Sequence, residues 1–121
     1  MEIKVIRDKV LEVGNVTSCA AMIIKKDGDI VEYVITDPTK TIVSLADLVD
    51  IAGLMALRYD IVGYDKILGG LKMTTDEFRD HLTISASIEG NILVVVIPNN
   101  ANLNKVTECI KDILSIELKN N

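Results

Sequence analysis

The side chains that most often perform chemistry in proteins are scarce in this chain and lie far apart in the sequence. His81 is the sole histidine, and the two cysteines, Cys19 and Cys109, stand near opposite ends. A histidine base must reach the proton that it abstracts, and a structural zinc site takes four ligands, mostly Cys and His. A lone histidine at a turn is most often a surface residue, and buried thiols behave as small hydrophobic groups. We therefore predict no catalytic residue and no metal site.

The acidic and glycine-rich segments also lack the spacing of a known ligand site. Asp76, Glu77 and Asp80 fall in the segment DEFRDH, which does not have the ligand pattern of a calcium loop. Gly69 and Gly70 follow a predicted helix instead of opening one, and the P-loop pattern of nucleotide hydrolases does not occur. The sequence thus predicts no cofactor, and we expect an interaction protein instead of an enzyme.

Size and composition indicate one globular domain spanning residues 1–121. With 49% hydrophobic residues, the chain can bury a sizeable aliphatic core. Its formal charge of −5 argues against nucleic acid as a partner, because phosphate binding needs a basic surface. No apolar run reaches the roughly 18 residues of a membrane span, so we predict no membrane insertion. The N-terminal residues alternate charged and apolar types, unlike a signal peptide, and we expect a cytoplasmic protein.

Residues 45–68 are the most informative stretch, and we predict that they form one long helix. At about 100° per residue, apolar side chains cover two opposite faces of this helix. One face holds Leu45, Leu48, Val49, Ala52, Met55 and Ala56, and the other holds Leu54, Leu57, Ile61 and Leu68. Only a narrow polar seam remains, made of Asp47, Arg58 and Asp65. A surface helix of a monomer shows a wider polar half, so we expect another protein chain to cover part of this helix.

The remaining sequence predicts two further helices and five strands. The helices are expected at residues 2–13, ending at Gly14, and after Asn102, which is a good N-terminal cap. Apolar or alternating segments predict strands at Val16–Lys25, Ile30–Ile35, Leu71–Thr75, Leu82–Ile88 and Ile92–Pro98. The Asp27-Gly28 pair between the first two strands is typical of a tight hairpin turn.

These elements predict an α/β (α+β) single domain with a five-stranded, mainly antiparallel sheet. Strands that are apolar on both faces belong in the middle of a sheet that is covered on both sides, which applies to the first and the last strand. Placing these two side by side, with each hairpin extending outward, gives the strand order 2-1-5-4-3. The first and last helices then share one face, and the long helix covers the other. The short strand Leu71–Thr75 becomes an edge.

This order of elements resembles that of the Roadblock family, together with the long middle helix and the closing sequence VVVIPNNANLNKV. The resemblance covers nearly the whole chain and includes no invariant catalytic signature. That family includes a dynein light chain and the MglB-type regulators of small Ras-like GTPases. The resemblance implies a homodimer or heterodimer that pairs edge strands and stacks the middle helices. It also implies a scaffold or regulator of a small Ras-like GTPase that is not itself a GTPase.

The residues themselves favour such an interface. An unpaired strand edge recruits a partner unless it is blunted, and Leu71–Thr75 carries only Lys72 as a charge. The predicted dimer interface comprises Leu71, Lys72, Met73 and Thr74 on the edge and Leu48, Ala52, Met55 and Ala56 on the helix. The predicted docking surface for a further partner comprises Met55, Arg58 and Tyr59, since Arg and Tyr are favoured interface anchors and Met adapts to different partners. A salt-bridged helix surface is the alternative interpretation of Arg58 and Tyr59.

A small-molecule-binding sensory domain is the alternative function. Similar sheets with helices on both faces can enclose a small-molecule pocket. The scarcity of aromatic residues and of convergent polar residues in the predicted core argues against this alternative. A dimer in solution would favour the interaction protein, whereas a monomer with a large internal cavity would favour the sensor.

Overall fold

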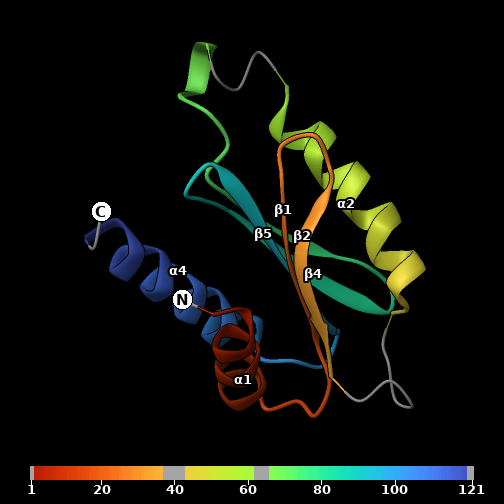
Figure 1. Ribbon diagram of the computed structural model, residues 1–121. Coiled ribbons are helices and arrows are strands. Elements are labelled where there is room, and N and C mark those ends of the chain that lie inside the picture. The colour runs from red at the N-terminus through yellow and green to blue at the C-terminus, as the bar shows by residue number, and fades with distance from the viewer. Residues whose placement is uncertain (1, 37–42, 62–65, 120–121) are drawn as a thin grey trace.

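The computed structural model describes residues 2–36, 43–61 and 66–119 (Figure 1). In chain order the elements are α1 (Ile3–Gly14), β1 (Ala20–Ile24), β2 (Ile30–Ile35), α2 (Leu45–Tyr59), β3 (Met73–Glu77), β4 (His81–Ile88), β5 (Asn91–Pro98) and α4 (Leu103–Lys119). The predicted fold class is confirmed. Within the described ranges, no helix has both the length and the apolar character needed to cross a membrane.

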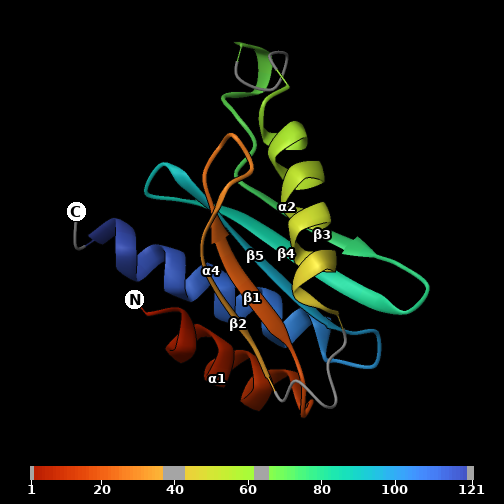
Figure 2. The ribbon, with the colours of Figure 1, turned by 45° about the vertical axis from the view of Figure 1, so that its right-hand side comes forward.

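The five strands form one antiparallel sheet in the order β2-β1-β5-β4-β3, as predicted. The central strand β5 is buried from Ile92 to Ile97, because helices cover both of its faces. In Figure 2, α2 lies in front of the sheet and α1 and α4 lie behind it, with β3 at the outer edge. This is the predicted division of the helices between the two faces.

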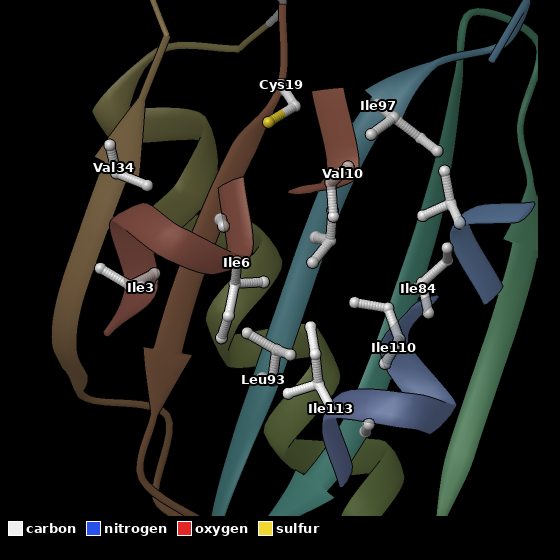
Figure 3. Close-up of a cluster of buried hydrophobic side chains, with 14 of the residues drawn as sticks. Ile3, Ile6, Val10, Cys19, Val34, Ile84, Leu93, Ile97, Ile110 and Ile113 are labelled. Atoms are coloured by element: carbon white, nitrogen blue, oxygen red, sulfur yellow. The ribbon is translucent and has the colours of Figure 1, made fainter. Parts of the chain in front are cut away.

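One face of the sheet is closed by α1 and α4 together. Ile6 and Val10 from α1 and Ile110 and Ile113 from α4 are at most 1% exposed. Their spacing of three or four residues puts them on one side of each helix. Figure 3 shows these side chains gathered between the two helices and the sheet, with Ile6 and Ile113 next to Leu93 of β5 and Ile110 next to Ile84 of β4. The largest apolar cluster of the described residues therefore lies between this helix pair and the sheet.

The junction between α1 and α4 explains the sequence Gly14-Asn15. We predicted that Gly14 would end the helix, but Asn15 adopts the left-handed cap conformation, with φ 54°. Gly14 is needed for another reason: a Cβ at this position would lie 3.0 Å from Cγ2 of Val106. The start of α4 is capped as predicted, because Oδ1 of Asn102 accepts a hydrogen bond from N of Lys105 at 3.2 Å.

The other face of the sheet is covered by α2 alone. The helix begins with a capping box, in which the Ser44 and Asp47 side chains each accept a backbone N–H of the other residue. Leu48, Ala52 and Met55 point at the sheet and are at most 4% exposed. They pack against alternate residues of β1 and β5, namely Ala20, Met22, Ile24, Ile92, Val94 and Val96.

Three predicted boundaries were wrong. The helix predicted for residues 45–68 ends at Tyr59, with Asp60 as its C-terminal cap, and residues 66–68 are helical again. The sequence after Asp60 continues with β-branched residues and a glycine, which are poor helix formers. Asp65 of the predicted polar seam lies outside the described residues. The first strand begins at Ala20 instead of Val16, and β3 is shifted to Met73–Glu77.

Candidate interaction surface

The edge strand β3 and the adjacent flank of α2 form the surface most suited to a partner. Among the described strands, β3 pairs only with β4, so its other side keeps unpaired backbone groups. Leu54 and Leu57 on α2 are 64% and 67% exposed. Helical spacing from the sheet-facing Met55 and from Arg58, which bonds to β3, turns Leu54 toward the β3 side of the helix and Leu57 away from the sheet. An apolar helix flank thus lies beside an open strand edge.

An apolar groove separates this flank of α2 from the hairpin that joins β3 to β4. Its volume is about 420 Å³, and it is lined by Val43, Ile51, Leu54, Met55, Arg58, Phe78, His81, Thr83 and Val96. The hairpin is closed by a hydrogen bond from N of Phe78 to O of His81 at 2.8 Å. Phe78 is 56% exposed although it lines the groove. Water therefore reaches a lining that is mostly hydrocarbon.

A carboxylate fixes the C-terminal half of α2 to the edge of the sheet. Arg58 donates a hydrogen bond from Nη1 to Oδ2 of Asp76 at 2.7 Å, and the pair is only partly exposed. The hydroxyl of Thr83 donates to the same oxygen at 3.2 Å, and that of Thr74 does so at 3.4 Å. Asp76 thereby joins α2, β3 and β4. The alternative interpretation of Arg58, a salt-bridged helix surface, is the one that the structure confirms.

A chain of hydroxyl groups continues this link toward the end of the helix. The hydroxyl of Tyr59 lies 3.0 Å from Oγ of Ser85, which is fully buried, and Ser85 also bonds to the hydroxyl of Thr74. Burial raises the pKa of the Tyr59 phenol, so this hydroxyl stays protonated and can donate. Tyr59 therefore holds the helix in place as well as bordering the predicted docking surface.

The sequence interpretation missed the polar members of this cluster. We considered Asp76 only as part of the segment DEFRDH, and we gave Thr83 and Ser85 no role. The signal was nevertheless present, because hydroxyl residues at alternate positions of a strand in a sheet covered on both sides need internal partners. Those partners come from α2 and from the neighbouring strand β3.

The structure divides the predicted dimer interface into two groups. Leu48, Ala52, Met55 and Ala56 are 0–6% exposed and pack beneath α2, so they belong to the core of their own protomer. Contact of α2 with a partner helix would use its exposed apolar residues instead, which are Leu45, Val49, Leu54 and Leu57, and Met55 reaches the surface only as part of the groove lining. The edge residues Leu71, Lys72, Met73 and Thr74 are half-buried or exposed at the open side of the sheet. Their role in dimerisation stays a prediction.

The two cysteines lie apart from this surface, whereas His81 belongs to it. Burial raises the pKa of the Cys19 thiol, and it also raises that of Cys109 on α4. A thiol with a raised pKa is less often the reactive thiolate. His81 lies at the mouth of the groove. The residues that the structure describes contain no group of three His, Cys, Asp or Glu side chains that could hold a metal ion.

Several solved structures are similar to this one. The gliding protein MglB from Thermus thermophilus has a TM-score of 0.71 and 18% identity, covering 90% of this chain and 80% of that chain. A structure described as MglB with a tetrameric arrangement has the same score and identity, covering 90% and 79%. A Roadblock/LC7 domain from Streptomyces avermitilis has a TM-score of 0.66 and 14% identity, covering 99% and 94%. No protein-family profile and no curated protein matches the sequence. The predicted Roadblock fold is confirmed.

Proposed function

We propose that this chain, which has the Roadblock fold, self-associates through β3 and α2 and acts as a regulator or scaffold for a small Ras-like GTPase. The observation that carries the proposal is the exposed Leu54 beside the open edge of β3, together with the exposed Leu57 on the outer side of α2. Antiparallel pairing of two β3 strands would extend the sheet across both protomers and bring the two α2 helices together. The exposed leucines would then be covered.

Self-association has two further supports. A two-fold interface is self-complementary, so a single surface with both an open edge and an apolar flank is sufficient to build it. One structure with the same fold is an MglB in a tetrameric arrangement. The interface would be an ordinary one if it buried about 1,600 Å² in total.

The GTPase partner is inferred from the resemblance to MglB-type regulators. We nominate no catalytic residue, and we propose that any stimulation of GTP hydrolysis arises because the protein holds the GTPase's own residues in place. The docking surface is proposed at the end of α2, around Met55, Arg58 and Tyr59. Arg58 is 41% exposed while it is paired with Asp76, so part of its guanidinium group remains accessible to a partner.

Light scattering and a charge substitution test the dimer. The wild-type protein is expected to have twice the protomer mass, and Leu54→Asp is expected to be a folded monomer because the new carboxylate cannot be buried unpaired. Val5→Asp is the matched control, since Val5 is 39% exposed but lies on α1, across the sheet from α2. A monomeric wild-type protein at micromolar concentration would contradict the proposal.

Single-turnover hydrolysis tests the partner. Each small Ras-like GTPase of the source genome would be loaded with GTP or GDP and mixed with the dimer. We expect binding to the GTP form and a changed hydrolysis rate, both lost with Arg58→Glu. Equal binding to both nucleotide forms with an unchanged rate would leave scaffolding as the function. The absence of binding to any of these GTPases would overturn the GTPase assignment.

The alternative function, a small-molecule sensor, has the apolar groove in its favour. Its volume of about 420 Å³ falls within the range of ligand sites, which is roughly 300–1,000 Å³. A monomer that binds an apolar dye stoichiometrically in this groove would favour the sensor over the dimeric regulator.

A further inference from the structure

Ile67 and Leu68 are the most exposed large apolar side chains that the structure describes, at 81% and 73%. Within the connection between α2 and β3, they belong to the short helical segment at residues 66–68, which is drawn in green beyond the end of the sheet (Figure 1). Exposed hydrocarbon costs about 25 cal/mol for each Å² left in water. Two adjacent aliphatic side chains in this position therefore indicate a cover that a single protomer does not provide.

We propose that Ile67 and Leu68 of one protomer insert into the apolar groove beside α2 of a second copy. The proposal rests on the β3-to-β3 dimer described above and specifies its register and its contacts. The groove, at about 420 Å³ and lined by residues such as Ile51, Leu54 and Phe78, is large enough to receive aliphatic side chains. Each dimer would contain two such insertions, related by the two-fold axis.

The charges on the edge select one register for the two β3 strands. Thr74 and Asp76 are on the α2 face of the sheet, because both bond to polar groups of α2 or β4 on that face. With Thr74 on the two-fold axis, Lys72 lies directly opposite Asp76 of the second copy. Opposite charges across an antiparallel pair are stabilising and like charges are destabilising. Centring on Asp76 would place two carboxylates together, and centring on Thr75 would leave Lys72 without an acid directly across.

The carboxylate of Asp76 has room for this additional cation. Among the described residues, all hydrogen bonds to Asp76 are accepted by Oδ2, from Arg58, Thr74 and Thr83. Oδ1 is therefore left to accept a hydrogen bond from Lys72 of the second copy. A lysine contributes a compact charge on a long, flexible stem, which suits a partly exposed edge.

The same register brings the connection of one protomer to the groove of the other. Gly70 lies opposite Phe78 of the second copy, so the residues before Gly70 run along the hairpin that borders the groove. The connection joins the α2 layer to the sheet layer, and the groove lies between those two layers. The charges of the two segments that would meet agree with this placement. Residues 66–72 carry two lysines and no acid, whereas residues 77–80 carry Glu77 and Asp80 against Arg79.

Disulfide trapping between two different variants tests the insertion. Ile67→Cys and Phe78→Cys would be prepared separately, each with Cys109→Ser, then mixed and oxidised. We expect a mixed disulfide joining one chain of each variant, identified by mass spectrometry. Val31→Cys replaces Phe78→Cys as the control, because Val31 is similarly exposed, at 52%, but lies on the opposite edge strand β2. Equal yields with Val31→Cys and with Phe78→Cys would overturn the insertion.

A third variant separates this inference from the proposed dimer. Thr74→Cys should form a symmetric disulfide-linked dimer, since the two Cβ atoms of a directly opposed pair lie about 4.5–5.5 Å apart. A Thr74→Cys dimer without the mixed disulfide would overturn the insertion and leave the β3 pairing intact. A monomeric wild-type protein with neither crosslink would overturn both. We also expect Ile67→Ser with Leu68→Ser to raise the dissociation constant at least about tenfold, and an unchanged constant would overturn the insertion.

Discussion

The two faces of the sheet are covered in different ways, and the difference supports the proposed position of the dimer interface. Two helices, α1 and α4, cover one face, and the larger apolar cluster lies beneath them. A single helix, α2, covers the other face above a smaller cluster. One helix is too narrow to cover five strands. The side of the α2 face nearest β3 therefore keeps an apolar groove and the exposed Leu54.

The grooves on the two faces differ in chemistry as well. Between α1 and α4 lies a groove of about 830 Å³, lined mainly by charged and amide side chains such as Lys9, Glu12, Asn102, Lys105 and Asp112. Water can hydrate these polar groups, although hydrocarbon from residues such as Val13 and Ile116 also lines this groove. The groove beside α2 is about half as large and mostly hydrocarbon. An uncovered apolar groove is typical of an interaction or ligand site, so the comparison supports the proposal that a partner binds on the α2 face.

The largest expected effect on stability comes from removing a buried side chain on the face of the sheet that α1 and α4 cover. Ile110→Ala removes a fully buried side chain between α4 and the sheet. We expect the free energy of unfolding to fall by about 2–5 kcal/mol, because the loss of buried hydrocarbon adds to the cost of a cavity. Urea denaturation followed by circular dichroism measures the change. The loss should not depend on protein concentration.

The matched substitution on the α2 face is Leu54→Ala, at a side chain that is 64% exposed. In dilute protein, where protomers are separate, its unfolding free energy should stay within about 0.5 kcal/mol of the wild type. At high concentration it should unfold earlier than the wild type, because the dimer contributes less. Equal losses for Ile110→Ala and Leu54→Ala in dilute protein would contradict the division between a self-sufficient face and a partner-dependent face.

The second effect concerns the polar link on the α2 face. Asp76→Ala removes the acceptor shared by Arg58 and Thr83, and Thr83 is only 4% exposed. We expect a loss of about 1–3 kcal/mol, because a buried hydroxyl is left without its acceptor. Asp80→Ala, on the exposed hairpin, is the control and should change stability by at most about 0.5 kcal/mol. Equal losses for both substitutions would show that the hydrogen bonds accepted by Asp76 do not contribute to the free energy of unfolding.

The first turn of α2 should respond to acid. The hydrogen bond from N of Ser44 holds the pKa of Asp47 below its ordinary value, and the hydroxyl of Ser44 lowers it further. A carboxylate with a depressed pKa contributes stability above its unfolded-state pKa, and this contribution is lost as the pH falls below about 4. Asp47→Asn should lower the free energy of unfolding at pH 7, because the folded state stabilises the ionised carboxylate, and it should have a smaller effect at pH 2.5. Urea titrations at both pH values measure the free energy of unfolding. An equal loss at both pH values would contradict a stabilising role of the Asp47 carboxylate in the capping box.

Most of the fold followed from apolar patterning. Strand order could be predicted because β5 is a continuous apolar run, which only a central strand with two covered faces accommodates. The end of α2 could not be placed, since apolar residues continue through Leu68 and the pattern alone does not show where packing against the sheet stops. Gly14 was interpreted as a helix terminator, whereas its role depends on the approach of Val106, which no local pattern reveals.

The candidate interaction surface was only partly predictable, because a sequence pattern does not show which elements pack against one another. Sequence reasoning located the open edge and the surplus of apolar residues on α2, because both follow from composition and order. It could not tell which leucines face the sheet, so Leu48 was assigned to a partner and Leu54 was not. It also gave Ser85 no partner, although the hydroxyls of Tyr59 and Thr74 surround it. Cross-element hydrogen bonds depend on register, which periodicity alone does not fix.

The smallest expected effect is a gain in stability on the outer side of α2. Gly53 lies in the middle of the helix, its φ is not positive, and a Cβ at this position would meet nothing within 4 Å. Gly53→Ala should therefore raise the free energy of unfolding by about 0.5–1 kcal/mol, because alanine loses less backbone entropy on folding. Gly90→Ala is the contrasting variant, since Gly90 is equally uncrowded but has a φ of 82°, and this change should destabilise the protein. Helical spacing turns Gly53 away from the β3 side, so the dissociation constant of the Gly53→Ala dimer should equal that of the wild type. A weakened dimer would mean that the partner covers α2 from its outer side instead of along the β3 flank.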